Sequence, residues 1–292
     1  MINSSEAQQN IRTPGFLRWW GYLSILLLFV CQGLLFLKIE PIYTFFTPIQ
    51  WWLYILSLDA FIAARRGSSL IASQPVEFLA MLVLSNVCWL IFENYNYVLH
   101  NWYYINLSPH LWQRLLGYFL SFGSIFPGIF FTAEAIESLD WFSDRHPKPR
   151  AIRPSFLIGS LLCGTCCVLF PLFLPSSYVF GFVWLGFFFL LEPLNYWMGA
   201  DSLYRDFEKG RWQRFWALIV GGAFCGLLWE FWNYWAHAKW VYTVPFTPGV
   251  HYFEMPLLGF LGFPPFALEC FAMYHFTRKL MERGSSQIAE TI

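Results

Sequence analysis

The chain contains eight apolar stretches, and most of them are long enough to cross a bilayer as a helix. A transmembrane helix needs about 20 consecutive apolar residues. Because a backbone in lipid must satisfy its own hydrogen bonds, such stretches fold as helices and not as open sheet. We predict an all-α integral membrane protein with about eight transmembrane helices. The predicted helices cover residues 17–37, 48–64, 76–98, 111–139, 155–174, 178–200, 213–236 and 256–281.

The composition agrees with a membrane protein and excludes other classes. Charged residues make up 12% of the chain, whereas a soluble domain carries about 25%. The net charge is zero, so we expect no nucleic-acid partner. Membrane lipid is the expected partner, with a hydrophobic small molecule as a candidate substrate. Cofactors and the oligomeric state are left open.

The positions of lysine and arginine predict the orientation. With the N-terminus inside, the inner segments hold fifteen of the eighteen basic residues, and the outer segments hold only Lys38, Arg114 and Lys239. Basic residues concentrate on the cytoplasmic side of membrane proteins. We therefore expect both termini in the cytoplasm, an even number of crossings, and a location in the plasma (inner) membrane.

An internal repeat is the most informative pattern. The segments 93–100 and 230–237 both read E-x-x-N-Y-x-x-H, at an offset of 137 residues. The same offset relates Cys88 to Cys225 and Phe126 to Phe263, and one residue of slip then pairs the W-x-Y segments 102–104 and 240–242. Self-similarity at a fixed offset indicates a duplicated structural unit.

The repeat predicts the organisation of the whole chain. Two four-helix units have the same topology, because each crosses the membrane an even number of times, and a pseudo-two-fold axis along the membrane normal would relate them. The predicted units are a first repeat at 1–139, in which 1–16 is a cytoplasmic tail, a cytoplasmic linker at 140–154, a second repeat at 155–281 and a cytoplasmic tail at 282–292.

The repeated motif is also the candidate site. Its polar residues recur at helical spacing, so we expect them on one face of the third and seventh helices. A carboxyl group inside a membrane span faces the bundle interior or a water-filled cavity. If the axis brings the two helices together, their polar groups converge. The predicted catalytic residues are Glu93, Glu230, His100 and His237. The predicted substrate-binding residues are Asn96, Asn233, Tyr97, Tyr234, Trp102, Trp240 and Glu269.

Three interpretations of this motif remain open from the sequence. It could be a structural hydrogen-bond network, an acid/base site, or a metal or proton pathway. A carboxyl group in apolar surroundings is suited to proton transfer near neutral pH. The spacing of Glu to His is long for a single metal ion, and we predict no metal site. Only Lys239 and Arg114 add positive charge near the motif, which argues against a pyrophosphate substrate.

The sequence favours a membrane-embedded enzyme that acts on a lipid or isoprenoid. The alternatives are a small-solute or proton-coupled transporter or channel, and a scaffold without catalytic activity. Signatures of nucleotide binding, zinc proteases and serine hydrolases are absent. By architecture alone the expected arrangement resembles the duplicated helical carotenoid cyclases, but the Pro-x-Glu-Glu signature of that family is missing, so the resemblance assigns no residue.

Overall fold

The computed structural model describes residues 16–142, 147–244 and 250–291. Within these residues, eight apolar helical segments are long enough to cross a membrane, which confirms the prediction of an all-α, multi-pass membrane protein. These segments are Trp19–Phe36, Ile42–Arg66, Pro75–Leu99, Leu111–Glu137, Pro154–Phe173, Ser177–Met198, Gln213–Trp235 and Leu257–Gly284.

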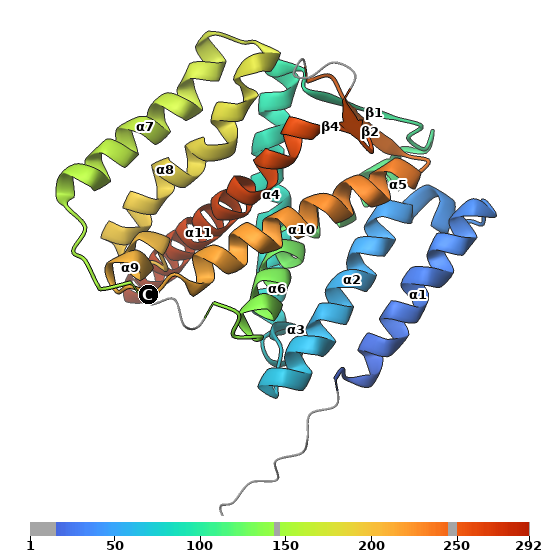
Figure 1. Ribbon diagram of the computed structural model, residues 1–292, viewed down its shortest axis with the longest axis horizontal. Coiled ribbons are helices and arrows are strands. Elements are labelled where there is room, and N and C mark those ends of the chain that lie inside the picture. Colours follow the sequence, from blue (N-terminus) through green and yellow to red (C-terminus); the bar gives the residue numbers. More distant parts are fainter. Residues whose placement is uncertain (1–15, 143–146, 245–249, 292) are drawn as a thin grey trace, which may run out of the picture.

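The helices form one bundle in which two long helices lie at opposite edges (Figure 1). These are α1 (Trp19–Phe36), which packs on α2 (Ile42–Arg66), and α7 (Pro154–Phe173), which packs on α8 (Phe180–Met198). Both edge helices expose most of their apolar side chains. An apolar exposed surface is what a helix in contact with lipid requires.

Between the two edge pairs lie α4 (Pro75–Leu99), α6 (Ile125–Glu137), α10 (Gln213–Trp235) and α11 (Phe263–Thr291) (Figure 1). Close approach of α10 to α11 depends on glycine. A Cβ atom at Gly226 would lie 2.2 Å from Cδ2 of Phe263, and one at Gly222 would lie 2.7 Å from Cβ of Ala267. Small residues let membrane helices pack closely, and here they fix the α10 backbone one turn before Glu230.

Proline interrupts the fourth apolar segment of each predicted unit. The stretch expected as one helix at 111–139 is two helices, α5 (Leu111–Gly123) and α6, which meet at Ser124. Pro127 follows this junction, and proline cannot donate a helical hydrogen bond. In the second half, the 3-10 helix η2 (Leu257–Gly262) gives way to α11 just before Pro264 and Pro265.

Short elements complete the structure. The 3-10 helix η1 (Ser177–Val179) precedes α8, while α3 (Leu70–Ser73) and α9 (Leu203–Glu208) connect longer helices. Strands β3 (His251–Tyr252) and β4 (Met255–Pro256) pair with each other near the start of η2.

A two-stranded antiparallel sheet joins the two halves of the chain at one end of the bundle (Figure 1). Strand β1 (Trp102–Ile105) follows α4, and strand β2 (Lys239–Tyr242) follows α10. In the register, Trp102 lies opposite Tyr242 and Tyr104 lies opposite Trp240. The hydropathy pattern did not predict these strands.

Candidate functional site

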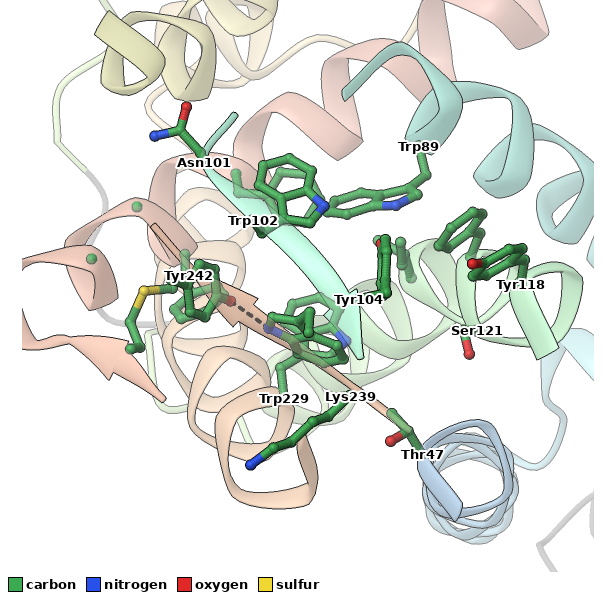
Figure 2. A pocket seen from close by; sticks show the side chains of 18 of the residues that line it. Thr47, Trp89, Asn101, Trp102, Tyr104, Tyr118, Ser121, Trp229, Lys239 and Tyr242 are labelled. Carbon is green, nitrogen blue, oxygen red and sulfur yellow. Dashed lines mark hydrogen bonds between the residues drawn. The ribbon is translucent and has the colours of Figure 1, made fainter. Parts of the chain in front are cut away.

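A cavity of about 430 Å³ lies beside the β1–β2 sheet, between helices of both halves. Its volume is within the range of small-molecule sites, which is roughly 300–1,000 Å³. Fourteen of its lining residues are aromatic, and the indoles of Trp89 and Trp102 lie side by side on one wall with Tyr104 nearby (Figure 2). The predicted binding residues Trp102 and Trp240 both line it.

Glu93 lies behind the first aromatic wall and is not itself a lining residue. Three donors converge on its Oε1 atom: the hydroxyl of Tyr104 at 2.5 Å, the indole nitrogen of Trp89 at 2.9 Å and that of Trp102 at 3.3 Å. All three donors belong to residues that line the cavity. The carboxyl group of Glu93 therefore positions one wall of the cavity and lies one hydrogen bond away from its interior.

Glu230 occupies a related position behind the opposite strand. The hydroxyl of Tyr242 donates to its Oε1 atom at 2.7 Å, and the indole nitrogen of Trp240 donates to that hydroxyl at 2.8 Å. Glu230 is fully buried. Its Oε2 atom has no hydrogen-bond partner among the described residues. Both carboxyl groups thus accept a hydrogen bond from a strand tyrosine, and Glu93 accepts from the indoles of Trp89 and Trp102 as well.

The two tyrosines keep their protons at neutral pH. Burial, followed by the negative charge of Glu93, raises the pKa of Tyr104 well above its ordinary value. Burial and the charge of Glu230 do the same to the pKa of Tyr242. Each tyrosine can therefore present a neutral hydroxyl at the cavity wall, with a carboxyl group directly behind it.

The asparagines of the motif bind the protein backbone. Nδ2 of Asn96 donates to the carbonyl of Trp102 at 2.9 Å, and its Oδ1 accepts from the backbone nitrogen of Trp102 at 2.9 Å. Asn233 makes the same two bonds to Trp240, at 2.9 and 3.0 Å. Both side chains therefore hold a strand against the end of the preceding helix.

The expectation that the whole motif shares one helical face is wrong at its histidines. Helix α4 ends at Leu99, where His100 takes a left-handed backbone conformation, and α10 ends before His237. His100 is exposed, and its carbonyl accepts from the hydroxyl of Thr243. His237 stacks on Tyr43 and lies 2.9 Å from its hydroxyl. Neither histidine lines the cavity.

The remaining predicted residues also lie away from the cavity. The side chain of Tyr97 is 81% exposed, and that of Tyr234 is 43% exposed. Glu269 is fully buried and accepts from the backbone nitrogen of Phe187 at 2.8 Å, one turn after the lining residue Phe266. The described residues contain no group of three or more metal-ligating side chains.

Two groups that touch the cavity were missed as site residues. Tyr104 and Tyr242 place the hydroxyls nearest to the carboxyl groups. The signal was available, because the repeated W-x-Y segments contain both of them. Comparison with protein-family models, curated proteins and solved structures finds no match.

Proposed function

We propose that this protein is a membrane-embedded enzyme that acts on a lipid or isoprenoid held in the aromatic cavity. The pairs Tyr104–Glu93 and Tyr242–Glu230 are its acid/base groups. One observation carries this proposal: two cavity-lining tyrosines each donate to a carboxyl group behind the wall, at 2.5 and 2.7 Å. A hydroxyl that touches the ligand and is backed by a carboxyl group can pass a proton in either direction.

The proton path is short in both directions. When a tyrosine gives its proton to the ligand, the proton is replaced from a protonated carboxyl group behind it. When a tyrosine takes a proton from the ligand, its own proton moves to the carboxylate. Only Glu93 or Glu230 changes protonation over the full step, and the tyrosine ends as it began.

The aromatic lining suits a ligand that develops positive charge. The faces of Trp and Tyr attract a cation within about 6 Å of the ring centroid. Trp184, Trp229 and Phe266 pack as adjacent rings along the cavity. Protonation of a carbon–carbon double bond would create such a charge beside these rings.

A structural role is favoured for one part of the motif. The side chains of Asn96 and Asn233 are bonded to the backbone of β1 and β2. We therefore assign them to the positioning of the strands and keep the catalytic role for the carboxyl–hydroxyl pairs.

We also infer that the chain is a tandem repeat, with units at 1–139 and 155–281 and a pseudo-two-fold axis along the membrane normal. The strand register supports this. By the sequence repeat, Trp102 corresponds to Trp240 and Tyr104 to Tyr242. In the sheet, Trp102 pairs with Tyr242 and Tyr104 pairs with Trp240. Such a pairing is unchanged when the two copies are exchanged, as in an isologous interface.

The proposed orientation places both termini in the cytoplasm of a cell and the sheet on the outer side of the plasma membrane. The basic residues Arg66, Arg211 and Arg214 support it, because they form ion pairs among the helix ends remote from the strands. Reporter fusions test this orientation. Those at positions 206 and 285 should report the cytoplasm, and one at 105 the outside.

The test of the enzymatic proposal compares membrane lipids from cells that express the protein with those from cells that express Glu93→Gln, Glu230→Gln, Tyr104→Phe or Tyr242→Phe. We expect a product in the wild type that each variant reduces at least about 100-fold, the usual contribution of general acid/base catalysis. Tyr103→Phe on β1, which does not line the cavity, is the matched control. Full conversion by both Glu variants would exclude the acid/base role.

A further inference from the structure

Six of the nine non-aromatic polar side chains that line the cavity come from one side of it. The polar end lies between α2 and α5, and the apolar end lies along α8 and η2. The polar end contains Thr44, Thr47, Ser108, Gln113, Arg114 and Ser121. The apolar end contains Gly181, Trp184, Leu258, Gly259 and Leu261. A cavity of this kind matches a molecule with one polar end and one hydrocarbon end.

Two cations line the cavity, and their surroundings differ. Nζ of Lys239 forms an ion pair with Glu254. In Figure 2 its amine points away from the labelled aromatic rings. Arg114 is half-buried and lines the cavity, and none of the ion pairs among the described residues includes it. Its guanidinium is therefore the positive charge that remains available to a ligand.

A neighbouring side chain adds to the site of Arg114. Gln113 accepts a hydrogen bond from the hydroxyl of Ser108 through its side-chain oxygen. Its NH2 group then remains as a donor, because the oxygen is already used. A guanidinium and an amide NH2 on adjacent residues provide donors for an anion but no acceptor.

On the basis of the proposed function, we infer that the ligand is an amphiphile with a single anionic head group, a phosphate or carboxylate, bound by Arg114. Its hydrocarbon chain lies among the aromatic rings towards α8 and η2. Arginine binds phosphate and carboxylate through two parallel hydrogen bonds, which fixes the head group as well as attracting it. A single available cation suits one anionic group better than a pyrophosphate.

The first experiment measures binding to the purified full-length protein in nanodiscs of phosphatidylcholine, with tryptophan fluorescence as the signal. The probes are farnesyl phosphate and farnesol, which share a chain and differ in the head group. We expect farnesyl phosphate to bind at least about tenfold more tightly, a difference of about 1.4 kcal/mol. Arg114→Gln should remove this difference. Lys38→Gln, which removes a cation of the α1–α2 connection outside the cavity lining, should keep it.

A second arm identifies the source of the anion. Phosphatidic acid and diacylglycerol are compared in the same way. If phosphatidic acid competes with farnesyl phosphate and loses its advantage in Arg114→Gln, the head group comes from a phospholipid and the anion site stands. Equal binding of farnesyl phosphate and farnesol by the wild type would overturn the inference, as would undiminished discrimination by Arg114→Gln.

The two proposals fail in different ways. If the wild type binds farnesyl phosphate and farnesol equally while a lipid product is still formed, the head-group site is excluded and the enzymatic proposal stands. Discrimination that persists while Glu93→Gln and Glu230→Gln have no effect on lipid composition removes the catalytic proposal and leaves a lipid-binding protein.

Discussion

The carboxyl group of Glu230 accepts from the hydroxyl of Tyr242 at 2.7 Å, and its second oxygen has no hydrogen-bond partner within the described residues. Glu93 instead accepts from three donors at one oxygen. A buried acceptor that loses its partner bears the full desolvation penalty. The two halves of the site therefore differ in how strongly each depends on its tyrosine.

This difference predicts unequal effects of the same substitution. Tyr242→Phe removes the hydroxyl that donates to the fully buried Glu230 and should lower the free energy of unfolding by about 1–3 kcal/mol. Tyr104→Phe leaves two indole donors on Glu93 and should cost no more than about 1 kcal/mol. Thermal unfolding in detergent measures both, with Tyr103→Phe as the control. Equal losses would show that the extra donors of Glu93 have no energetic role.

The asparagine that anchors β1 predicts a local loss of order. Asn96→Ala removes the bonds between the side chain and the backbone of Trp102, which are buried. The strand should then exchange its amide hydrogens faster, and stability should fall by about 1–3 kcal/mol. Hydrogen exchange of residues 101–105 is the measurement. Asn94→Ala on the exposed side of the same helix is the control, because its side chain bonds only within α4. Unchanged exchange in Asn96→Ala would mean that the strand is held by its pairing with β2 alone.

Filling the cavity should block the ligand without unfolding the protein. Gly117 of α5 lines the cavity, and a Cβ atom there would meet Phe45 at 3.8 Å, an ordinary contact distance. Gly117→Leu should weaken binding of farnesyl phosphate at least about tenfold, because the new side chain takes up space that the ligand needs. Gly159→Leu on α7, where a Cβ atom would meet nothing within 4 Å, is the control. Both changes replace glycine in a helix by a better helix former, so neither should lower the melting temperature. Undiminished binding by Gly117→Leu would place the ligand elsewhere.

The tyrosine hydroxyls predict a loss of stability in alkali. Because the pKa values of Tyr104 and Tyr242 are raised in the folded protein, the unfolded chain loses these protons first, near pH 10. The folded state then binds more protons than the unfolded state, so stability is retained below pH 10 and falls above it. Two such groups give a slope of about 2.7 kcal/mol per pH unit. Chemical denaturation between pH 8 and 11.5 should show a shallower decline in the double variant Tyr104→Phe/Tyr242→Phe. The same slope in both proteins would mean that these hydroxyls titrate normally.

Hydropathy predicted most of the fold. The span of α4 was expected at 76–98 and lies at Pro75–Leu99. The start of α2 was expected at Pro48 and lies at Ile42, because the helix continues across a backbone distortion at Phe45. Pro48 fits after this distortion, since it has no amide hydrogen to donate to the preceding turn. These helix boundaries depend on residues that are close together in the sequence, so the sequence alone predicts them approximately.

The site was predicted less completely, for a physical reason. Helical spacing identified Glu93, Glu230 and both asparagines as interior groups, and the structure buries Glu230 and Asn233 fully. It gave no information on what they contact. Those contacts come from β1 and β2, four-residue strands that are stable only when paired across the two halves. Periodicity within one segment carries no signal for such long-range pairing.

The β1–β2 pairing has a consequence for how this protein can change over time. If the units descend from one ancestral sequence, an ancestor could have been a pair of identical chains. Each substitution in its gene would then have changed two equivalent positions of the cavity lining at once. In a single chain the copies vary independently, and at the repeat offset Arg114 corresponds to His251, which does not line the cavity. Fusion would thus have permitted a cavity with two chemically different ends, which a symmetric pair of chains cannot build.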